Sequence, residues 1–471
     1  MTGNDNSRAA HDILDWVLSF LEDNEGYRVW PDMVPGQIYR AQPDRAPLSG
    51  KSLDTVFDEF KTGILPGITH WNHPGFAAYF NSSATLPSVM AEAVSAAVNT
   101  NTMLWKSSPA GTEIEQKTLD WLQKMLGLTG FTGITYDGGS ASSFHALAAM
   151  RENFLGPEYR KAGLFGLTGD HPVIYLTEQT HNSIHKALIT LGFGTDSFQY
   201  VRVNDDFSMD TLNLCELIAS DKRSGRQPAC VVATLGSTSC TALDPVDDIA
   251  KICREEGVWL HVDAAHGGSA AVLPEVREKF DGWEKADSIV VNPHKWLFIP
   301  LELSVLFVRE PGVLKNAFHF SAEYLKTKQD GRIESYMDYG IPLGRRFRCL
   351  KLWFSLNYHG IDFYRRKIEQ HLSLARLVYD ALDRSEDFEI MAPQPLSTTC
   401  FRALPGSGED ADSFNERLMD AINGTGRFFI SHTRLNNRFV LRHVVSGVKV
   451  TEKHIQGFLS LLMEIKQHMD N

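Results

Sequence analysis

The sequence contains no apolar run long enough to form a membrane-spanning helix. Its most apolar stretch, residues 288–308, is interrupted by polar residues such as Asn292 and Glu302 and by two prolines, whereas a span needs about 20 consecutive apolar residues. Residues 1–11 are polar and lack the apolar core of a signal peptide. We therefore expect neither membrane insertion nor secretion, and the cytoplasm is the default location.

Cysteine and positive charge are also scarce. The chain has six cysteines in 471 residues and no Cys-x-x-Cys pair, which argues against a disulfide framework or a metal site and favours a reducing compartment. Lys and Arg number 46 against 58 Asp and Glu, a net charge of −12. Such an acidic chain has no general attraction for nucleic acid or anionic lipid, so we expect neither as a partner.

Predicted strands and helices alternate from about residue 115. The expected strands are 133–136, 173–176, 230–234, 258–262 and 288–291, and the expected intervening helices are 140–153, 185–191 and one ended by Gly257. This alternation predicts an α/β fold in which parallel strands are covered by helices on both faces. After about residue 350 we expect helices at 350–358 and 362–382, strands at 428–430 and 438–442, and a last helix at 452–468, which together form a smaller α+β domain.

The N-terminal segment carries an apolar stripe at helical spacing. The stripe consists of Ile13, Leu14, Trp16, Val17, Phe20 and Leu21. A lone helix must bury such a stripe, and the residues alone leave open whether it packs within the monomer or on a partner subunit.

Polar residues follow the predicted strands at the sheet edge where α/β proteins bind ligands. They are Gly138–Ser142, His181, Ser237, Thr238, Asp263 and Asn292–Lys295.

Two of these residues have both a chemical and a purely structural interpretation. Apolar neighbours lower the pKa of a lysine and make it a nucleophile that forms Schiff bases, although Lys295 could also extend to solvent. Asp263 could pair with a protonated pyridinium nitrogen, or it could cap the turn at Gly267 and Gly268.

The polar residues at two other strand ends also have both interpretations when each is considered alone. Gly138–Ser142 suits a phosphate at a helix start, but Ser140 is also an ordinary N-cap. His181 could stack on a flat ring or move a proton, or it could be a capping or core histidine. Taken together, a phosphate cradle, a stacking histidine, an aspartate and a lysine describe the site of one cofactor, pyridoxal 5'-phosphate.

Six segments also match motifs of a known family. They are 69–74 (Thr-His-Trp-Asn-His-Pro), 108–113 (Ser-Pro-Ala-Gly-Thr-Glu), 139–142 (Gly-Ser-Ala-Ser), 261–265 (His-Val-Asp-Ala-Ala), 292–296 (Asn-Pro-His-Lys-Trp) and 342–348 (Pro-Leu-Gly-Arg-Arg-Phe-Arg). With these motifs the chain resembles the group II pyridoxal-phosphate-dependent amino acid decarboxylases, and in particular the aromatic-L-amino-acid decarboxylases.

The resemblance implies a fold of type I among pyridoxal-phosphate enzymes, with a mostly parallel, seven-stranded central sheet. It implies an N-terminal helical segment at 1–80 that swaps between the subunits of a homodimer, a large cofactor-binding α/β domain at 81–350 and a small C-terminal α+β domain at 351–471. The active sites would lie at the subunit interface, and the N-terminal stripe would pack on the partner.

The resemblance also assigns roles to residues. The catalytic set would be Lys295, His181, Tyr336 and Asp263. The cofactor contacts would be Ser140, Ala141, Ser142, His181, Thr238, Asp263, Ala265, Asn292, His294 and Lys295. The substrate pocket would be lined by Trp71, Phe80, Asn81, Ser82 and, from the neighbouring subunit, Met103.

The expected reaction is decarboxylation of an aromatic L-amino acid (tryptophan, tyrosine, phenylalanine or dihydroxyphenylalanine) to its amine and CO₂. Tyr336, in a catalytic loop at 326–339, would protonate the substrate carbon; related aldehyde synthases carry a phenylalanine there. Two residues depart from the family pattern: His266 stands where Tyr or Trp is common, and Glu302 where an Asp is frequent.

Three alternatives remain at this stage. The first is an aldehyde synthase, against which Tyr336 argues. The second is a decarboxylase of histidine or of an acidic amino acid, and Trp71 and Phe80 argue against an acidic substrate. The third is an inactive homologue that serves as a binding or scaffold protein, against which the intact Lys295, Asp263 and His181 argue.

Overall fold

The computed structural model describes residues 3–156, 159–163, 172–320, 334–406 and 408–470. Its packing divides the chain into two units. The larger comprises residues 87–372 and 392–398, and the smaller comprises residues 1–86, 373–391 and 399–471. No helix in the described part of the chain combines the length and the apolar character needed to cross a bilayer.

The larger unit is built on a seven-stranded sheet with the strand order β1-β7-β6-β5-β4-β2-β3. The strands are β1 (Thr132–Tyr136), β2 (Pro172–Leu176), β3 (Phe198–Tyr200), β4 (Gln227–Thr234), β5 (Trp259–Asp263), β6 (Ser288–Val291) and β7 (Ser304–Val308). Strand β7 runs antiparallel to both of its neighbours, and the pairs from β6 to β3 are all parallel. The mostly parallel, seven-stranded sheet expected from the sequence is thus confirmed.

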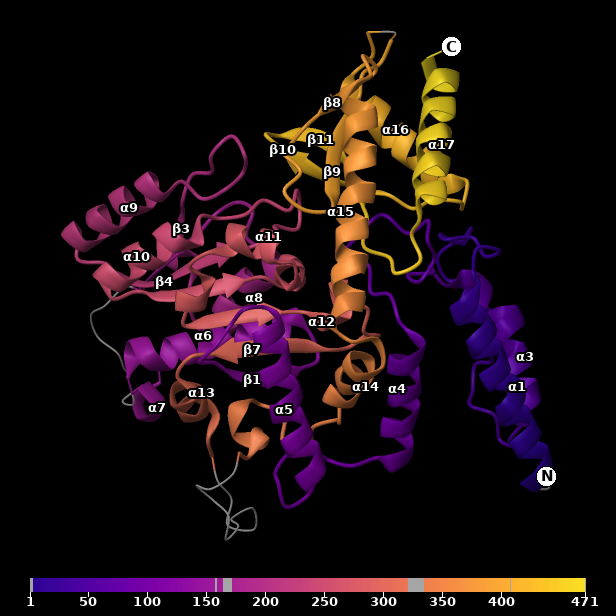
Figure 1. Ribbon diagram of the computed structural model, residues 1–471, viewed down its shortest axis with the longest axis horizontal. Helices are drawn as coiled ribbons and strands as arrows, with labels where there is room; N and C mark the ends of the chain where they lie inside the picture. The colour runs from indigo at the N-terminus through magenta and orange to yellow at the C-terminus, as the bar shows by residue number, and fades with distance from the viewer. Residues whose placement is uncertain (1–2, 157–158, 164–171, 321–333, 407, 471) are drawn as a thin grey trace. The chain divides into compact units, whose positions relative to one another are not determined.

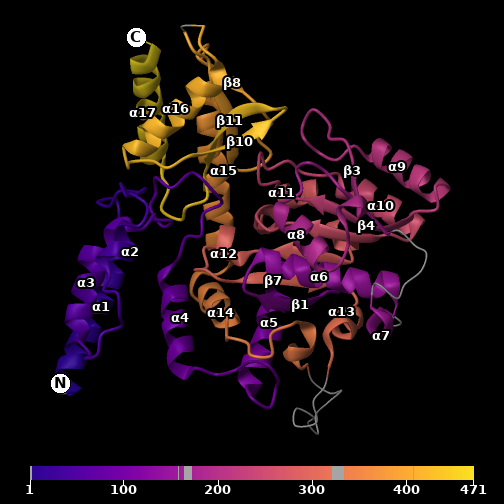
Figure 2. The same ribbon diagram turned by 180° about the vertical axis from the view of Figure 1, so that it is seen from behind.

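Helices cover both faces of this sheet. The helices of the larger unit are α4 (Leu86–Val98), α5 (Pro109–Met125), α6 (Gly139–Leu155), α7 (Tyr159–Ala162), α8 (Asn182–Thr190), α9 (Thr211–Arg223), α10 (Val246–Glu256), α11 (Pro274–Arg277), α12 (Pro293–Trp296), α13 (Pro311–Phe318) and α14 (Cys349–His359). Because side chains alternate along a strand, Ile174 packs in the core beneath α6 and α8, while the Tyr175 hydroxyl donates to Asp221 of α9 on the other face. Helix α5 crosses the face turned toward the viewer in Figure 1, and α6 and α8 cover the face seen in Figure 2.

Local signals in the sequence account for much of this unit. Helix α10 ends at Gly257, which adopts a left-handed conformation with φ of 69°, as a C-terminal glycine does. All five strands that the sequence predicts for this unit are present. Strands β3 and β7 were not predicted, because β3 has three residues and β7 lies within the apolar stretch that continues from the lysine motif.

The smaller unit contains a four-stranded antiparallel sheet with the order β10-β11-β9-β8. Its strands are β8 (Phe388–Ile390), β9 (Thr398–Ala403), β10 (Ser431–Leu435) and β11 (Arg438–Val444), and its helices are α1 (Gly3–Glu22), α2 (Gln37–Ala41), α3 (Leu53–Gly63), α16 (Ala411–Gly424) and α17 (Glu452–Asp470). Helix α15 (Ile361–Asp383) contributes its first half to the larger unit and its second half to the smaller one. The prediction of a strand at 428–430 is wrong. Phe429 forms only an isolated bridge with Phe76, and strand β10 begins at Ser431.

The N-terminal stripe is only partly covered within the chain. Trp16 of α1 packs on Phe57 and Phe60 of α3 at ring distances of 5.5 and 5.9 Å. Leu14 and Leu18, one turn apart on the same helix, remain 40% and 38% exposed. Within the chain, α1 therefore buries part of the stripe, while Leu14 and the neighbouring Leu18 stay open to solvent.

A buried ion pair joins two distant segments of the larger unit. Arg345 donates to Glu115 at 2.7 Å, and both side chains are almost fully buried. Arg345 also donates to the carbonyl oxygen of Thr135 at 3.0 Å, and the Thr135 hydroxyl donates to Glu115 at 2.7 Å. The carboxylate and the guanidinium thus both have further polar partners, as a buried pair requires.

We expect Glu115→Ala to lower the free energy of unfolding by about 3–5 kcal/mol, because it leaves the Arg345 charge buried and unpaired. Urea unfolding followed by circular dichroism measures the loss. The double variant Glu115→Leu/Arg345→Met removes both charges and should recover most of the stability. A loss of less than about 1 kcal/mol for Glu115→Ala, the range of an exposed pair, would contradict this account.

A buried histidine makes the smaller unit sensitive to acid. The His443 ring of β11 packs against the Phe458 ring of α17, tilted by 31° with the centroids 4.2 Å apart, and burial lowers the pKa of His443 to about 3. Because the unfolded chain takes up a proton at this residue near pH 6.5 and the folded chain does not, the contribution to stability is present above pH 6.5 and is lost as the pH falls below it.

We expect His443→Phe, which keeps the ring, to weaken this pH dependence. Between pH 6.5 and 5.5 the wild-type protein should lose about 1 kcal/mol more than the variant. Urea unfolding at both pH values checks this, with the exposed His468→Gln as the control. Equal slopes for wild type and His443→Phe would show that the histidine is not the source.

Candidate active site

The polar residues expected at the strand ends converge on one edge of the sheet. Asp263 is the last residue of β5, and in the parallel ladders it lies opposite Thr234 of β4 and Val290 of β6. Asn292 follows β6 directly, and its backbone N–H donates to the carbonyl of Ala265 at 3.0 Å. We call this region, with His181, Lys295 and the start of α6, the carboxyl-end site.

Lys295 lies in α12, the single helical turn that follows β6. The residue as a whole is half-buried, but its ammonium group is enclosed by protein, and this desolvation lowers its pKa. The Asp263 carboxylate is near enough to oppose the shift without reversing it. Lys295 is therefore easier to convert to a neutral, nucleophilic amine than a surface lysine.

Asp263 is buried and does not cap the turn that follows it. Its Oδ1 accepts from the backbone N–H of Ala265 at 3.1 Å, whereas His266 is the N-cap of the turn at Gly267–Val272 and makes no capping side-chain hydrogen bond. The Asp263 charge also raises the pKa of His181 and of His261 against the lowering effect of burial. One carboxylate therefore acts electrostatically on two histidines and on Lys295.

His181 caps a helix, which is one of the interpretations that the sequence left open. It is the N-cap of α8, and its Nδ1 accepts from the backbone N–H of Ser183 at 3.2 Å. Burial lowers its pKa, and both Asp263 and Lys295 act on it electrostatically. A ring that accepts at Nδ1 and is neutral carries its proton at Nε2, which leaves that N–H for other contacts.

The start of α6 is suited to an anion. Gly138 is its N-cap and supplies no side-chain hydrogen bond to the helix start. A Cβ atom on Gly139 would lie 2.7 Å from the Asn292 side-chain nitrogen, so only glycine permits this close approach. Ser140 is exposed and lines a cavity of about 420 Å³ together with His181 and Lys186. Backbone N–H groups at a helix start bind phosphate well.

Ser142 differs from Ser140 in the direction of its hydroxyl. It is fully buried, and its Oγ lies 2.6 Å from Ser304 Oγ, which in turn donates to Asn292 Oδ1 at 2.6 Å. The Ser142 hydroxyl therefore joins α6 to β7 and the end of β6 and does not face the cavity that Ser140 lines.

The other expected cofactor contacts have distinct surroundings. His294 is buried, accepts from the Leu303 backbone N–H at Nδ1 (3.0 Å), and has a pKa lowered by burial to about 3. Thr238 is exposed in the turn after β4, and Ala265 is partly buried beside the α6 core.

The expected substrate residues are divided between the two units. In the smaller unit, Asn81 donates from Nδ2 to the Trp71 carbonyl at 2.7 Å, and the Arg442 guanidinium lies 5.8 Å from the Phe80 ring centroid. Ser82 follows Asn81 and is half-buried. In the larger unit, the Met103 carbonyl accepts from the Met337 backbone N–H at 2.8 Å.

Tyr336 lies in a short 3₁₀ helix, η8 (Tyr336–Tyr339), whereas residues 326–333 of the expected loop fall outside the described residues. Its ring is 2% exposed and lies over the Arg345 guanidinium at 4.4 Å. Burial raises its pKa well above the ordinary value, so the phenol keeps its proton.

Sequence reasoning missed several residues that shape this region. Arg345 and Glu115 are 230 positions apart, and nothing in the sequence indicates that they meet. The two departures from the family pattern have direct partners: His266 stacks on Trp296 at 4.5 Å, and Glu302 accepts from Arg348 at 2.9 Å. A flat ring is thus kept at His266, and a carboxylate is kept at Glu302.

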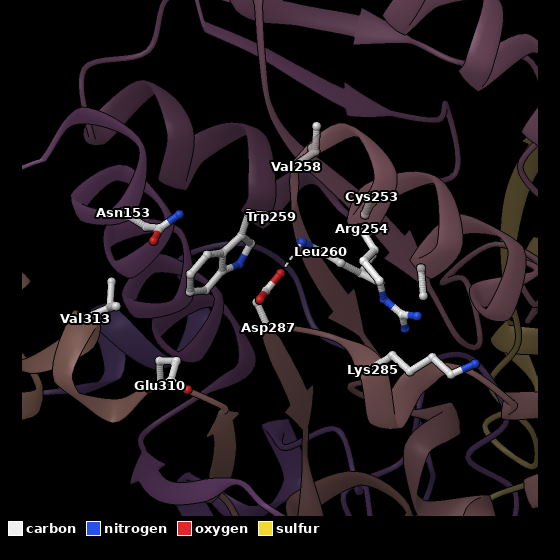
Figure 3. Close-up of a pocket in the computed structure, with 12 residues that line it drawn as sticks. Asn153, Cys253, Arg254, Val258, Trp259, Leu260, Lys285, Asp287, Glu310 and Val313 are labelled. Carbon is white, nitrogen blue, oxygen red and sulfur yellow. Dashed lines mark hydrogen bonds between the residues drawn. The ribbon is translucent and has the colours of Figure 1, made fainter.

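A different cavity, of about 290 Å³, lies at the opposite ends of the central strands. Figure 3 shows Trp259 at the start of β5 and Asp287 just before β6, where the Asp287 carboxylate accepts from the Leu260 backbone N–H at 2.7 Å. It holds none of the expected site residues. Lys285 also lines this cavity. It precedes β6, whereas Lys295 follows that strand, so Lys285 is a matched control for experiments on Lys295.

Comparisons with known proteins agree with this geometry. The conserved domain of pyridoxal-dependent decarboxylases matches residues 35–404. Tryptophan decarboxylase 2 of Oryza sativa subsp. japonica is 34% identical over 467 residues, 96% of this chain and 93% of the relative. Phenylacetaldehyde synthase of Arabidopsis thaliana is 33% identical over 467 residues, 96% of this chain and 94% of the relative.

Solved structures give the same result. The crystal structure of Oryza sativa TDC with PLP and tryptamine superposes with a TM-score of 0.94 at 31% identity, covering 100% of this chain and 99% of that one. Rhodiola rosea 4-hydroxyphenylacetaldehyde synthase superposes with a TM-score of 0.91 at 28% identity, covering 100% of both chains. These matches confirm the resemblance and the fold expected from the sequence.

The residues of the carboxyl-end site fit pyridoxal phosphate. The uncapped start of α6 suits the phosphate, a buried carboxylate suits the ring nitrogen, and a lysine of lowered pKa suits the aldehyde. Within the described residues, no three His, Cys, Asp or Glu side chains are placed to hold a metal ion.

We expect Lys295→Ala to abolish covalent attachment of pyridoxal phosphate and to lower kcat by at least about 10³, as removal of a covalent participant does. Borohydride reduction followed by mass spectrometry should detect the cofactor on the wild-type chain and not on the variant. Lys285→Ala, at the other end of the same strand, should keep both attachment and activity. Attachment to the Lys295→Ala chain at wild-type yield would refute the assignment.

Proposed function

The chain belongs to the pyridoxal-dependent decarboxylase family, and from that premise we propose that it decarboxylates an aromatic L-amino acid to the corresponding amine and CO₂. The observation that carries the proposal is the desolvated ammonium group of Lys295 beside Asp263 at the carboxyl ends of the strands. Relatives that are named tryptophan decarboxylase and tyrosine decarboxylase support an aromatic substrate.

The cofactor would be held at both of its ends by residues of the larger unit. Backbone N–H groups at the start of α6, with Ser140 and Ala141, would bind its phosphate, assisted by the Nε2 side of His294 and by Asn292. The Lys295 amine would bind its aldehyde carbon, and Thr238 and Ala265 would lie near the ring. Ser142 would support this cradle through the hydrogen bond of its hydroxyl to Ser304 rather than by contacting the phosphate itself.

Bound pyridoxal phosphate supplies the electron sink that accepts the electron pair of the broken Cα–carboxylate bond. Asp263 would hold a proton on the pyridine nitrogen, which a buried carboxylate stabilises strongly. His181, neutral because burial lowers its pKa, would stack on the ring without adding a positive charge. Lys295 would exchange protons with the substrate amine.

Tyr336 would deliver a proton to the substrate Cα after CO₂ has left. Burial raises its pKa, so it is present as the protonated phenol at neutral pH. The competing outcome is the aldehyde synthase reaction, in which one O₂ and one water are consumed and the amino acid yields aldehyde, CO₂, ammonia and H₂O₂. Two relatives carry aldehyde synthase names, so this is the second candidate function, and the presence of Tyr336 disfavours it.

Recognition of an aromatic side chain would fall to Trp71, Phe80, Asn81, Ser82 and the partner subunit's Met103. Burying one ring contributes about 1.5–3 kcal/mol, which favours aromatic over small substrates but does not separate the aromatic ones.

We also propose that the enzyme is a homodimer with active sites at the interface, in which segment 1–80 packs on the partner. The exposed face of α1 at Leu14 and Leu18 supports this, because a monomer gains nothing by leaving those side chains in water. All six cysteines are free thiols, which supports a cytoplasmic location.

Incubation of the cofactor-loaded protein with single L-amino acids tests the reaction. We expect an aromatic amine and CO₂ without H₂O₂, and little product from histidine or glutamate. Tyr336→Phe should lower amine formation about 10²-fold or more, as loss of a general acid does, and should yield aldehyde with H₂O₂. Aldehyde and H₂O₂ from the wild-type protein would instead establish the second candidate function, and no turnover of any amino acid would refute both.

A further inference from the structure

Two stacked rings join the turn that carries Asp263 to the turn that carries Lys295. The imidazole of His266 lies parallel to the indole of Trp296, with 4.5 Å between the centroids and 8° between the planes. His266 comes three residues after Asp263, and both rings of the stack are buried. Trp296 is the last residue of α12 and directly follows Lys295. The contact therefore connects the two strand ends that carry the aspartate and the lysine.

A second histidine holds the indole at its edge. Trp296 Nε1 donates to Nδ1 of His371 in α15 at 2.9 Å, and the two ring planes are parallel to within 3°. Both side chains are fully buried, and a buried indole N–H needs such an acceptor. Because the indole N–H can only donate, His371 accepts at Nδ1 and its ring is not an imidazolium. We call Trp296 with His266 and His371 the indole clamp.

The chain that leaves α12 is held by the same histidine. Phe298 has a φ of 57°, a left-handed conformation that a bulky residue keeps only where its surroundings impose it. Its buried ring meets the His371 ring edge-on, at 5.7 Å and 90°. His371 therefore contacts the chain at Trp296 and again at Phe298. The short segment that carries Lys295 is thus fixed by ring contacts at two positions.

The direction of the Lys295 side chain depends on the orientation of Trp296. Consecutive side chains of a helical turn point about 100° apart, so a fixed indole also fixes the direction in which the lysine leaves the chain. The Asp263 carboxylate acts electrostatically on the Lys295 ammonium, and the strength of that effect depends on their separation. One backbone hydrogen bond, from Asn292 N–H to the Ala265 carbonyl at 3.0 Å, also joins the two turns. The ring stack is a second connection between them.

We propose that the indole clamp positions Lys295 relative to Asp263, so that bound pyridoxal phosphate is kept in one orientation and is bound tightly. His266 and His371 are then positioning residues that act through the indole. The inference rests on the proposed function in one respect, the attachment of pyridoxal phosphate to the lysine. A rigid ring that is held by the lysine at its aldehyde and by the aspartate at its nitrogen satisfies both contacts only at one separation of the two side chains.

Paired substitutions of His266 test whether its flat ring is the feature that matters. His266→Leu keeps a side chain of similar size but removes the flat ring, whereas His266→Phe keeps a ring on the indole. We expect His266→Leu to raise the Kd of pyridoxal phosphate about threefold to tenfold, the range of one lost ring contact. It should also weaken the visible circular dichroism per bound cofactor, a signal that requires a fixed orientation. His266→Phe should keep both quantities within about twofold of the wild type.

The control is a stacked histidine away from the clamp. His359 of α14 lies on Phe363 at 4.0 Å and 12°. His359→Leu removes this stack, and we expect it to change neither the Kd nor the dichroism.

A second pair of variants, at His371, gives an independent decision that does not depend on the folding of His266→Leu. His371→Leu removes the acceptor of the Trp296 N–H and leaves a buried donor unpaired. It should raise the Kd about threefold to tenfold and weaken the dichroism. His371→Gln keeps a side-chain acceptor and should do both to a smaller extent.

Wild-type Kd and dichroism in either leucine variant would overturn the proposal. Equal losses in His266→Leu and His266→Phe would also overturn it, because the flat ring would then not be what positions the indole. Failure of the wild-type chain to attach pyridoxal phosphate to Lys295 would instead refute the proposed function, so the two failures are distinguishable.

Discussion

The parallel pairing of β5 between β4 and β6 is the constraint on which the rest of the site depends. Because these strands run the same way, Asp263, the turn after Thr234 and the Asn292 turn emerge at one edge. The Ala265 carbonyl then accepts from the Asn292 backbone N–H, which fixes the path into the Lys295 turn. A slip of one residue in β5 would turn Asp263 to the other face of the sheet and away from the lysine.

Burial at this edge lowers the pKa of the lysine and of the histidines alike. It makes the ammonium form of Lys295 and the imidazolium forms of His181 and His294 costly, so their pKa values fall. Asp263 partly offsets the cost for Lys295 and His181. The site therefore concentrates its negative charge on one carboxylate and keeps its histidines neutral, which is the arrangement that a protonated heteroaromatic ring needs beside it.

The sequence predicted features whose cause is local and missed those whose cause is distant. Gly257 ends a helix wherever that helix packs, and the strand-end positions of Asp263 and Lys295 follow from alternation alone. The direction of the Ser142 hydroxyl depends on Ser304 in β7, a strand that the pattern did not predict. Phe428–Ile430 has the composition of a strand, but Phe429 finds only Phe76 as a bridge partner. The pairing of Glu115 with Arg345 is a property of the folded sheet and has no local signature.

The buried ion pair also bears on the chemistry of Tyr336. An unpaired guanidinium at 4.4 Å from the ring would favour the phenolate and lower the phenol pKa. Desolvation raises the pKa of Tyr336 most, Glu115 raises it further, and Arg345 lowers it. The carboxylate therefore cancels the charge of the arginine but leaves its flat surface for the ring to lie on. Arg345 can support the tyrosine by cation–π contact and packing while the phenol keeps its proton.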